Sequence, residues 1–246
     1  MSARVLIVGA TSAIAEALAR RYAAQRACLY LAARHPGRAA AIADDLLVRG
    51  AASVKVAAYD ATAPDAAAVL VAAAWEALGR IDVALIAHGS LPDQAACATS
   101  VALTRRELEV NLLSVIDLLT LLAGRMEAAR RGTLAVIGSV AGDRGRQSNY
   151  VYGTAKGALA IFLQGLAHRL APTGVRVLTI KPGFVDTPMT AAFAKGSLWA
   201  SPERVARDIQ RAIGRGTRVL YTPWFWRWIM LVIRLVPTAL FHRTKL

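Results

Sequence analysis

The sequence predicts a single doubly wound α/β domain, in which helices cover both faces of a parallel sheet. Short apolar runs alternate along the chain with longer helical patterns, and such alternation gives parallel strands joined by right-handed crossovers. The runs are apolar at consecutive positions, which is typical of strands that are buried on both faces. With 246 residues, of which 56% are hydrophobic, the chain is long enough for one large core.

Six runs rich in Val, Ile and Leu are predicted to form buried strands, and a seventh run is predicted to be the last strand. The six runs are RVLIVG at 4–9, CLYLAAR at 28–34, SVKVAAYD at 53–60, IDVALIAHG at 81–89, GTLAVIGS at 132–139 and VRVLTIKPG at 175–183, and the last strand is RVLYTP at 218–223.

Helical patterns lie between these strands, at 11–25, 36–50, 65–79 and 150–174. The last pattern closes on a Pro and a Gly, which are residues that end helices. No repeat or flexible linker interrupts the alternation. The prediction is therefore a single Rossmann-type domain, whose ligands bind beyond the carboxyl ends of the strands.

The first loop of this fold is a candidate anion site. A strand that ends at Val8, a turn at Gly9 and a helix that begins near Ser12 place backbone N–H groups and the positive end of a helix dipole at the exit of the strand. Taken alone, the same pattern also fits an ordinary turn between a strand and a helix.

A second motif points to acid–base chemistry. Ser139 is followed thirteen positions later by Tyr152, and Lys156 comes four positions after the tyrosine. Residues four apart share a helix face, so the ammonium of Lys156 is expected to lower the pKa of the Tyr152 phenol and make it a usable general acid. Ser139, at the end of a strand, is placed to bind a carbonyl oxygen. Tyr150 lies off this face.

Several motifs in a fixed order make the chain resemble the short-chain dehydrogenase/reductase family over nearly its whole length. These motifs are GATSAIA at 9–15, YDAT with Asp60, AHG at 87–89, Asn111 in EVNL, Ser139, YGTAK at 152–156 and PGFVDT at 182–187. The resemblance implies an oxidoreductase with Tyr152 as proton donor and Ser139 polarising the carbonyl. It also implies that Lys156 binds the nicotinamide ribose and tunes Tyr152, and that Asn111 supports a water in a proton relay.

The resemblance also implies the residues that hold a dinucleotide. Asp60 is expected to meet the adenine, Gly89 to lie against the cofactor, and Val185 with Thr187 to hold the carboxamide. Further contacts are expected at Gly9, Thr11, Ser12, Ala13, Ile14, Ala87, Pro182 and Gly183, and at Tyr152 and Lys156. Three residues depart from the pattern of the family, and they bear on cofactor affinity: Ala13 and Ala15 stand where glycines are expected, and His88 where Ala is more common.

The end of the second strand favours NADPH over NADH. NAD-binding domains place a carboxylate there for the ribose hydroxyls, whereas a basic residue suits a 2′-phosphate. This chain has Arg34 at that place, with Arg38 nearby and no acid. The alternative is that both arginines belong to a solvated face.

The C-terminal segment 223–246 is set apart by its composition from residues 1–222, the predicted catalytic domain. It combines Trp224, Trp226 and Trp228 with several basic residues. The stretch 224–236 is too short and too charged to cross a bilayer, which needs about 20 apolar residues, but it suits peripheral contact with a membrane surface. The alternative is that the segment packs against the domain or against a partner subunit.

This tail, together with TPM at 187–189 and the RLVP motif at 234–237, looks like that of the reductases acting on decaprenylphosphoryl-2-keto-ribose. The resemblance implies reduction of the 2-keto group of a pentose on a polyprenyl phosphate, after a flavin oxidase has formed the ketone. The alternatives are a reductase of 3-oxoacyl thioesters or other long-chain ketones, and a non-catalytic NADPH-binding interaction protein. Met189, Phe193 and Lys195 are predicted to line a lid over the pocket. A homodimer or homotetramer is expected.

The remaining features of the composition narrow the setting. The net charge of +14 indicates anionic partners, but the basic residues form no recognised nucleic-acid motif. Two cysteines in apolar surroundings indicate buried thiols and no disulfide. No secretory leader is apparent, so a cytoplasmic location is expected, with peripheral contact on the inner membrane. No metal site is predicted, since no second ligand stands at metal spacing from any of the histidines, His35, His88, His168 and His242.

Overall fold

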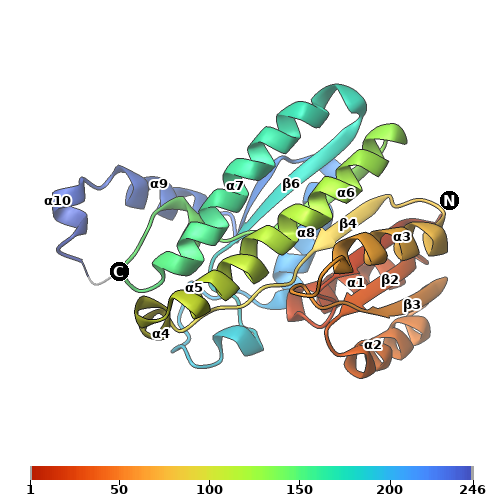
Figure 1. The fold of residues 1–246 in the computed structure, drawn as a ribbon, viewed down its shortest axis with the longest axis horizontal. Coiled ribbons are helices and arrows are strands. Elements are labelled where there is room, and N and C mark those ends of the chain that lie inside the picture. The colour runs from red at the N-terminus through yellow and green to blue at the C-terminus, as the bar shows by residue number, and fades with distance from the viewer. Residues whose placement is uncertain (1, 245–246) are drawn as a thin grey trace.

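The computed structural model describes residues 2–244 and is built around a seven-stranded sheet in the order β3-β2-β1-β4-β5-β6-β7 (Figure 1). Every pair of neighbouring strands is parallel. The predicted doubly wound, Rossmann-like domain is therefore confirmed. The strands are β1 (Arg4–Val8), β2 (Cys28–Ala33), β3 (Ser53–Ala58), β4 (Val83–Ile86), β5 (Gly132–Ile137), β6 (Val175–Pro182) and β7 (Val219–Thr222).

Helices cover both faces of the sheet and enclose two separate cores. One core is formed under α1, α2 and α8, and the other under α3, α6 and α7. The helices are α1 (Ala13–Ala23), α2 (Pro36–Val48), α3 (Ala66–Leu78), α4 (Gln94–Thr99), α5 (Val101–Leu108), α6 (Ser114–Ala128), α7 (Tyr150–Leu170), α8 (Pro202–Arg215), α9 (Trp226–Leu235) and α10 (Thr238–Phe241).

The prediction that 53–60 is a buried strand is wrong in its burial. Strand β3 lies at one edge of the sheet, and its side chains are exposed or half-buried, with Lys55 in the exposed set. An edge strand has a neighbour on one side alone, so its apolar run does not become a buried centre. Strand β7 at the opposite edge is likewise half-exposed, with Val219 45% exposed.

The sequence patterns above do not cover helices α4 to α6 or α8. Helix α8 nevertheless has clear end signals, because Ser201 caps it by accepting a hydrogen bond from the Arg204 N–H, and Pro202 is its first residue. Gly216, with φ of 67°, ends it in the left-handed conformation that favours glycine. A search for these signals predicts α8 without any tertiary information.

The segment after β7 packs against the loop that follows β5. Figure 1 shows α9 and α10 at the end of the molecule opposite the N-terminus, beside the start of α7. Trp226 and Met230 on α9 are buried against Val140, in the loop that follows β5. Gln147 reaches the carbonyl of Thr244. Lys245, one of the basic residues of the predicted tail, lies outside the described residues.

Candidate active site

The predicted site residues gather at the carboxyl ends of the central strands. Gly9 follows β1, Gly89 follows β4, Ser139 follows β5 and Gly183 follows β6. The ends of β5 and β6 are level, since the Gly138 N–H donates to the Ile180 carbonyl over 2.8 Å. Parallel strands bring their carboxyl ends to one edge, which is where ligands bind in this architecture.

The first loop has the backbone geometry of an anion site. Gly9 adopts φ of 83°, and a Cβ on it would lie 2.5 Å from the backbone nitrogen of His88, so both conformation and packing require glycine. Helix α1 begins directly after Ser12, whose side chain makes no capping hydrogen bond. The N–H groups of the first turn, at Ala13 and Ile14, thus remain available to an anion at the positive end of the helix. Thr11 is half-buried beside them.

The two alanines that replace expected glycines occupy different environments. Ala15 is completely buried in the core under α1, so its methyl group packs against the sheet. Ala13, the first residue of α1, is half-buried at the helix N-terminus. Of the two, Ala13 alone adds a methyl group at the surface where a phosphate would approach.

Arg34, after β2, and Asp60, after β3, carry opposite charges and lie near each other. Asp60 accepts hydrogen bonds from the backbone N–H and the hydroxyl of Thr62, both 2.9 Å long, and these bonds hold its pKa below the usual value. The charges of Arg34 and Arg106 lower it further. Arg34 and Asp60 are both exposed. The structure therefore brings the predicted adenine contact and the predicted phosphate contact into one solvent-facing group.

Helix α7 places Tyr152 and Lys156 side by side, as their spacing predicts. The Lys156 ammonium lies 5.6 Å from the centre of the Tyr152 ring and donates to the Ile137 carbonyl over 3.3 Å. The lysine is almost fully buried, whereas Tyr152 keeps partial exposure. The Ser139 side chain is close enough to the phenol to influence its pKa, and its Oγ accepts a hydrogen bond from the Ala141 N–H. Tyr150, at the start of the helix, is 45% exposed.

The pKa expected for Tyr152 is wrong in direction. Burial raises the pKa of the phenol to about 12, and the Ser139 side chain offsets part of this rise. Burial also lowers the pKa of Lys156 to about 8. Desolvation therefore outweighs the attraction between the two groups, and at neutral pH the pair is a neutral phenol beside an ammonium. A neutral phenol is the form that can donate a proton.

Asn111 is completely buried in a π-helical turn, Glu109–Leu113, between α5 and α6. Its Oδ1 accepts from the Ser90 N–H over 3.1 Å, and its Nδ2 donates to the Ser90 hydroxyl and to the Glu107 carbonyl. The Ser90 hydroxyl in turn donates to the Glu107 carboxylate. A Cβ on Gly89 would lie 2.8 Å from the Asn111 Oδ1. Asn111 therefore borders Gly89 directly, and π-helical turns are frequent at functional sites.

Ser90 and Glu107 are the residues of this cluster that sequence reasoning missed. Glu107 lies four positions before Asn111, a spacing that places both on one helix face. That spacing is the signal that predicts the contact once Asn111 is singled out. Ser90 follows Gly89, but nothing in the sequence pairs it with Asn111.

His88 is held in a neutral state next to the site. Its Nε2 lies 2.9 Å from the Ser114 hydroxyl, and burial together with the charge of Lys156 lowers its pKa to about 3. Tyr59 packs edge-on against the ring at 5.7 Å. Its Nδ1 has no hydrogen-bond partner among residues 2–244. The unusual histidine of the AHG motif is thus an uncharged packing group under the first loop.

Backbone hydrogen bonds join the two ends of the loop that follows β6. Val185 is buried and pairs with Ala200, and the Asp186 N–H donates to the Ala200 carbonyl over 2.9 Å. Thr187 begins a short 3-10 turn in which Thr190 bonds back to the Thr187 N–H. The predicted lid residues lie in the exposed stretch that follows, with Met189 and Phe193 about half-exposed and Lys195 paired with Asp186 at 2.7 Å.

A buried ion pair anchors the loop that carries Ser139. The Lys181 ammonium contacts the Asp143 carboxylate, which also accepts from the Tyr221 hydroxyl over 2.7 Å. The Asp143 side chain is 3% exposed and that of Lys181 is 12% exposed. Arg144, next in sequence, bonds to the carbonyls of Ile233 and Val236 on the C-terminal segment. The loop that carries Ser139 is therefore fixed to β6, to β7 and to the tail.

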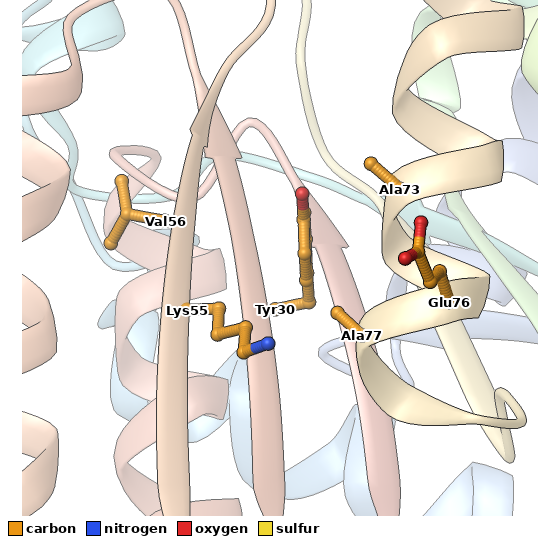
Figure 2. A pocket seen from close by; sticks show the side chains of 6 residues that line it. All are labelled: Tyr30, Lys55, Val56, Ala73, Glu76 and Ala77. Carbon is orange, nitrogen blue, oxygen red and sulfur yellow. The ribbon is translucent and has the colours of Figure 1, made fainter.

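One hollow lies away from these residues. It has a volume of about 500 Å³ and is formed between β2, β3 and α3 (Figure 2). Its walls include Tyr30 and Lys55, which pair at the middle of their strands and not at the carboxyl ends. Among residues 2–244, no group of three or more His, Cys, Asp or Glu side chains is arranged to hold a metal ion. The two thiols are free, and the predicted burial holds for Cys97 but is only partial for Cys28.

Comparisons with known proteins assign the family. The family model described as short chain dehydrogenase matches residues 3–197. A protein of Mycobacterium tuberculosis named as an uncharacterized oxidoreductase is 41% identical over 242 residues, which are 98% of this chain and 97% of that protein.

Two solved structures show the same fold at low sequence identity. A variant of actinorhodin polyketide ketoreductase with NADPH has a TM-score of 0.80 at 24% identity, covering 89% of this chain and 95% of that one. A short-chain dehydrogenase of Sphingobium yanoikuyae in complex with NADPH has a TM-score of 0.81 at 23% identity, covering 96% of both chains. The chain therefore belongs to the short-chain dehydrogenase family and is an NAD(P)H-dependent oxidoreductase.

Proposed function

We propose that the protein is an NADPH-dependent ketone reductase that uses Ser139, Tyr152 and Lys156. The observation that carries this proposal is the pairing of the half-buried Tyr152 with the buried Lys156 near Ser139, at the carboxyl edge of the sheet, where ligands bind in this architecture. Two of the structural neighbours are named as reductases of ketone-bearing substrates, the polyketide ketoreductase and a 3-oxoacyl-[acyl-carrier protein] reductase. The fold they share with this chain makes the same reaction class reasonable here.

In the proposed reaction, each of these residues has a separate role. The carbonyl carbon takes up a hydride, which a reduced nicotinamide would supply when bound. Ser139 donates a hydrogen bond to the carbonyl oxygen, and Tyr152 transfers its phenolic proton to that oxygen as the carbon–oxygen double bond becomes a single bond. The Lys156 ammonium stabilises the phenolate that remains until solvent returns a proton. Asn111, with Ser90 and Glu107, supports a water on the path of that proton.

The exposed Arg34 favours NADPH as the reductant. Its guanidinium stands beyond the end of β2, where a 2′-phosphate would be placed. The neighbouring Asp60 has its carboxylate occupied by Thr62. The first turn of α1, Gly89 and the loop of Pro182 to Thr187 complete the proposed cofactor site.

We propose that the ketone is the 2-keto group of a pentose linked to a polyprenyl phosphate. The apolar, basic surface of the C-terminal segment supports a lipid phosphate as substrate, because its side chains offer both an apolar platform and cations. Trp224, Trp228 and Leu235 are 66%, 57% and 72% exposed, and Arg227 and Arg234 are exposed between them. A 3-oxoacyl thioester is the alternative substrate, and the surface suits its chain equally well.

The same surface supports peripheral contact with the cytoplasmic face of an anionic membrane. Among residues 2–244, no helix has the length and apolar character needed to cross a bilayer. Aromatic residues at head-group level with arginines on lipid phosphates are typical of interfacial helices. The other proposed partners are a second copy of the chain, in a homodimer or homotetramer, and a flavin oxidase that forms the ketone.

The first experiment measures NADPH oxidation by the purified protein with a polyprenyl-phosphate 2-keto-pentose, with a 3-oxoacyl thioester as the parallel substrate. Turnover of the sugar lipid alone supports the proposed substrate. Turnover of the thioester alone keeps the reductase and replaces its substrate. NADPH binding without turnover of either substrate or of simple ketones would favour the non-catalytic interaction protein.

Membrane contact is tested by co-sedimentation with vesicles of phosphatidylglycerol and of phosphatidylcholine. Binding to the anionic vesicles alone, weakened by salt and by Trp228→Ser with Leu235→Ser, is the expected result. If the double variant instead changes the oligomeric state and the wild type ignores both vesicles, the surface is a subunit interface.

A further inference from the structure

The turn that follows Ser139 rests on the helix that carries the other two proposed catalytic residues. A Cβ on Gly142 would lie 2.6 Å from the backbone carbonyl carbon of Lys156, so the turn contacts the backbone of α7 directly. Within the turn, the Ala141 N–H donates to the Ser139 Oγ over 3.1 Å. The position of the Ser139 hydroxyl relative to α7 therefore depends on what holds this turn in place.

The C-terminal segment packs against the same turn. Val140, the residue after Ser139, is buried with Trp226 and Met230 in a small core that is separate from the two cores of the sheet. Arg146, farther along the loop, donates to the sulfur of Met230 over 3.5 Å. The segment thus meets the loop beginning at the residue that adjoins the proposed catalytic serine.

Arg144 joins the loop to both helices of the C-terminal segment. Its guanidinium donates to the carbonyls of Ile233 and Val236, the second over 2.6 Å, and lies 3.8 Å from the centre of the Phe241 ring on α10. Carbonyls at the end of a helix have no partner within the helix, and an arginine there also meets the negative end of the helix dipole. The half-buried Arg144 side chain therefore caps α9 from the loop of Ser139.

We propose that Arg144 is a positioning residue, which fixes the turn to the C-terminal segment and so holds the Ser139 hydroxyl where it meets the carbonyl oxygen of the ketone. The proposal rests on the proposed function, and it gives the segment a part in turnover besides its proposed contact with a membrane. A displacement of a catalytic group by about 1 Å can lower a rate about 10²-fold. Loss of the Arg144 contacts should therefore appear in kcat.

The first test is a double-variant cycle of Arg144→Ala and Ser139→Ala. The substrates are methyl pentofuranosid-2-ulose and an acetoacetyl thioester, which are soluble short forms of the two candidate substrates, so that lipid binding does not enter the measurement. We expect Arg144→Ala to lower kcat about 10–100-fold and to leave the Kd for NADPH within about twofold. In the Ser139→Ala protein the same change should lower kcat less than about threefold, because the hydroxyl that Arg144 positions is gone.

The matched control is Arg169→Ala, which removes an arginine from an exposed pair with Glu127 in the last turn of α7. It should leave kcat within about twofold. Unchanged kcat in Arg144→Ala, or an equal loss with and without the serine hydroxyl, overturns the proposal. If Arg144→Ala does not fold, Arg144→Lys, which keeps a cation but not the planar fork, takes its place in the cycle.

The second test compares hydrogen–deuterium exchange of the wild type and Arg144→Ala without substrate. The amides of 139–147 are expected to exchange about tenfold faster in the variant, while those of α1 and α2 keep their rates. Unchanged exchange in 139–147, or faster exchange throughout the chain, overturns the proposal. If the wild type reduces neither ketone, the proposed function fails, and the exchange of 139–147 still decides whether Arg144 holds the turn.

Discussion

The two halves of the candidate site differ in how they meet solvent. At the nucleotide end, Arg34 and Asp60 are exposed on loops beyond β2 and β3. At the catalytic end, Lys156 is 4% exposed, and the segment after β7 packs over the loop that follows Ser139. Charges at the open end are screened by water and salt, whereas those at the covered end are desolvated and act at short range.

Because of this difference, we expect the open end to select the cofactor and the covered end to carry out the proton transfer. The open end can recognise a phosphate through an arginine without altering the packing of the domain. The covered end shifts pKa values and fixes geometry, and it depends on buried partners. Substitutions at the covered end should therefore have large effects on turnover or folding, and those at the open end smaller effects on affinity alone.

The largest effect is expected for Tyr152→Phe. Loss of the phenolic proton should lower kcat about 10²–10⁴-fold, the usual contribution of a general acid, while the Kd for NADPH stays within about twofold. Stopped-flow turnover and fluorescence titration measure the two quantities. Unchanged turnover would remove Tyr152 from the mechanism and with it the contrast between the two ends.

The next effect concerns folding. Asp143→Asn leaves the buried Lys181 ammonium without its counter-charge, so the free energy of unfolding should fall by about 3–5 kcal/mol in urea titrations. Asp186→Asn breaks the exposed pair with Lys195, whose side chains are 49% and 55% exposed, and should cost less than about 1 kcal/mol. Similar losses in both variants would show that burial does not distinguish these pairs.

The pH dependence should follow Lys156, whose pKa burial lowers to about 8. Above that pH the ammonium is lost, so kcat/KM for ketone reduction should fall about tenfold per pH unit. The same pKa shift changes the free energy of unfolding in the opposite direction. Between pH 8 and the unfolded lysine pKa of about 10.4, the unfolded chain binds more protons, and this group makes the free energy of unfolding rise by up to about 1.4 kcal/mol per pH unit.

Lys156→Met separates these two trends. The variant should lose activity at all pH values, and its free energy of unfolding should lack the contribution that rises above pH 8. Urea titrations of both proteins at pH 7, 8, 9 and 10 measure the difference. A constant difference across this range would place the lysine pKa elsewhere.

The smallest effect is expected at the open end. Arg34→Ala should raise KM for NADPH about tenfold, the loss of one charge-assisted hydrogen bond, and leave KM for NADH and kcat within about twofold. Arg38→Ala, farther from the strand end, is the matched control. A wild-type enzyme that prefers NADH would contradict this assignment of Arg34.

The fold was predictable because its signals are local. Each strand lies in a mostly apolar run, so all seven strands were expected within a few residues. The start of α1 after Ser12 and the end of α7 before Pro172 and Gly174 also have signals in the sequence. Spacing alone also placed Tyr152 beside Lys156. Burial was less predictable, since β3 has the composition of a buried strand and becomes exposed through its position at the sheet edge.

Only the tertiary structure decided the electrostatics around Tyr152 and the burial of the tail. The sequence places an ammonium near Tyr152 and so predicts a lowered pKa, but burial raises it, because the cost of desolvation depends on neighbours from distant parts of the chain. In the same way, the tryptophans of the tail look alike in sequence. Folding exposes Trp224, which precedes α9, and Trp228 on α9, and it buries Trp226 against Gly183. Trp226 and Trp228 differ because a helix packed on one side sends residues two apart to different environments.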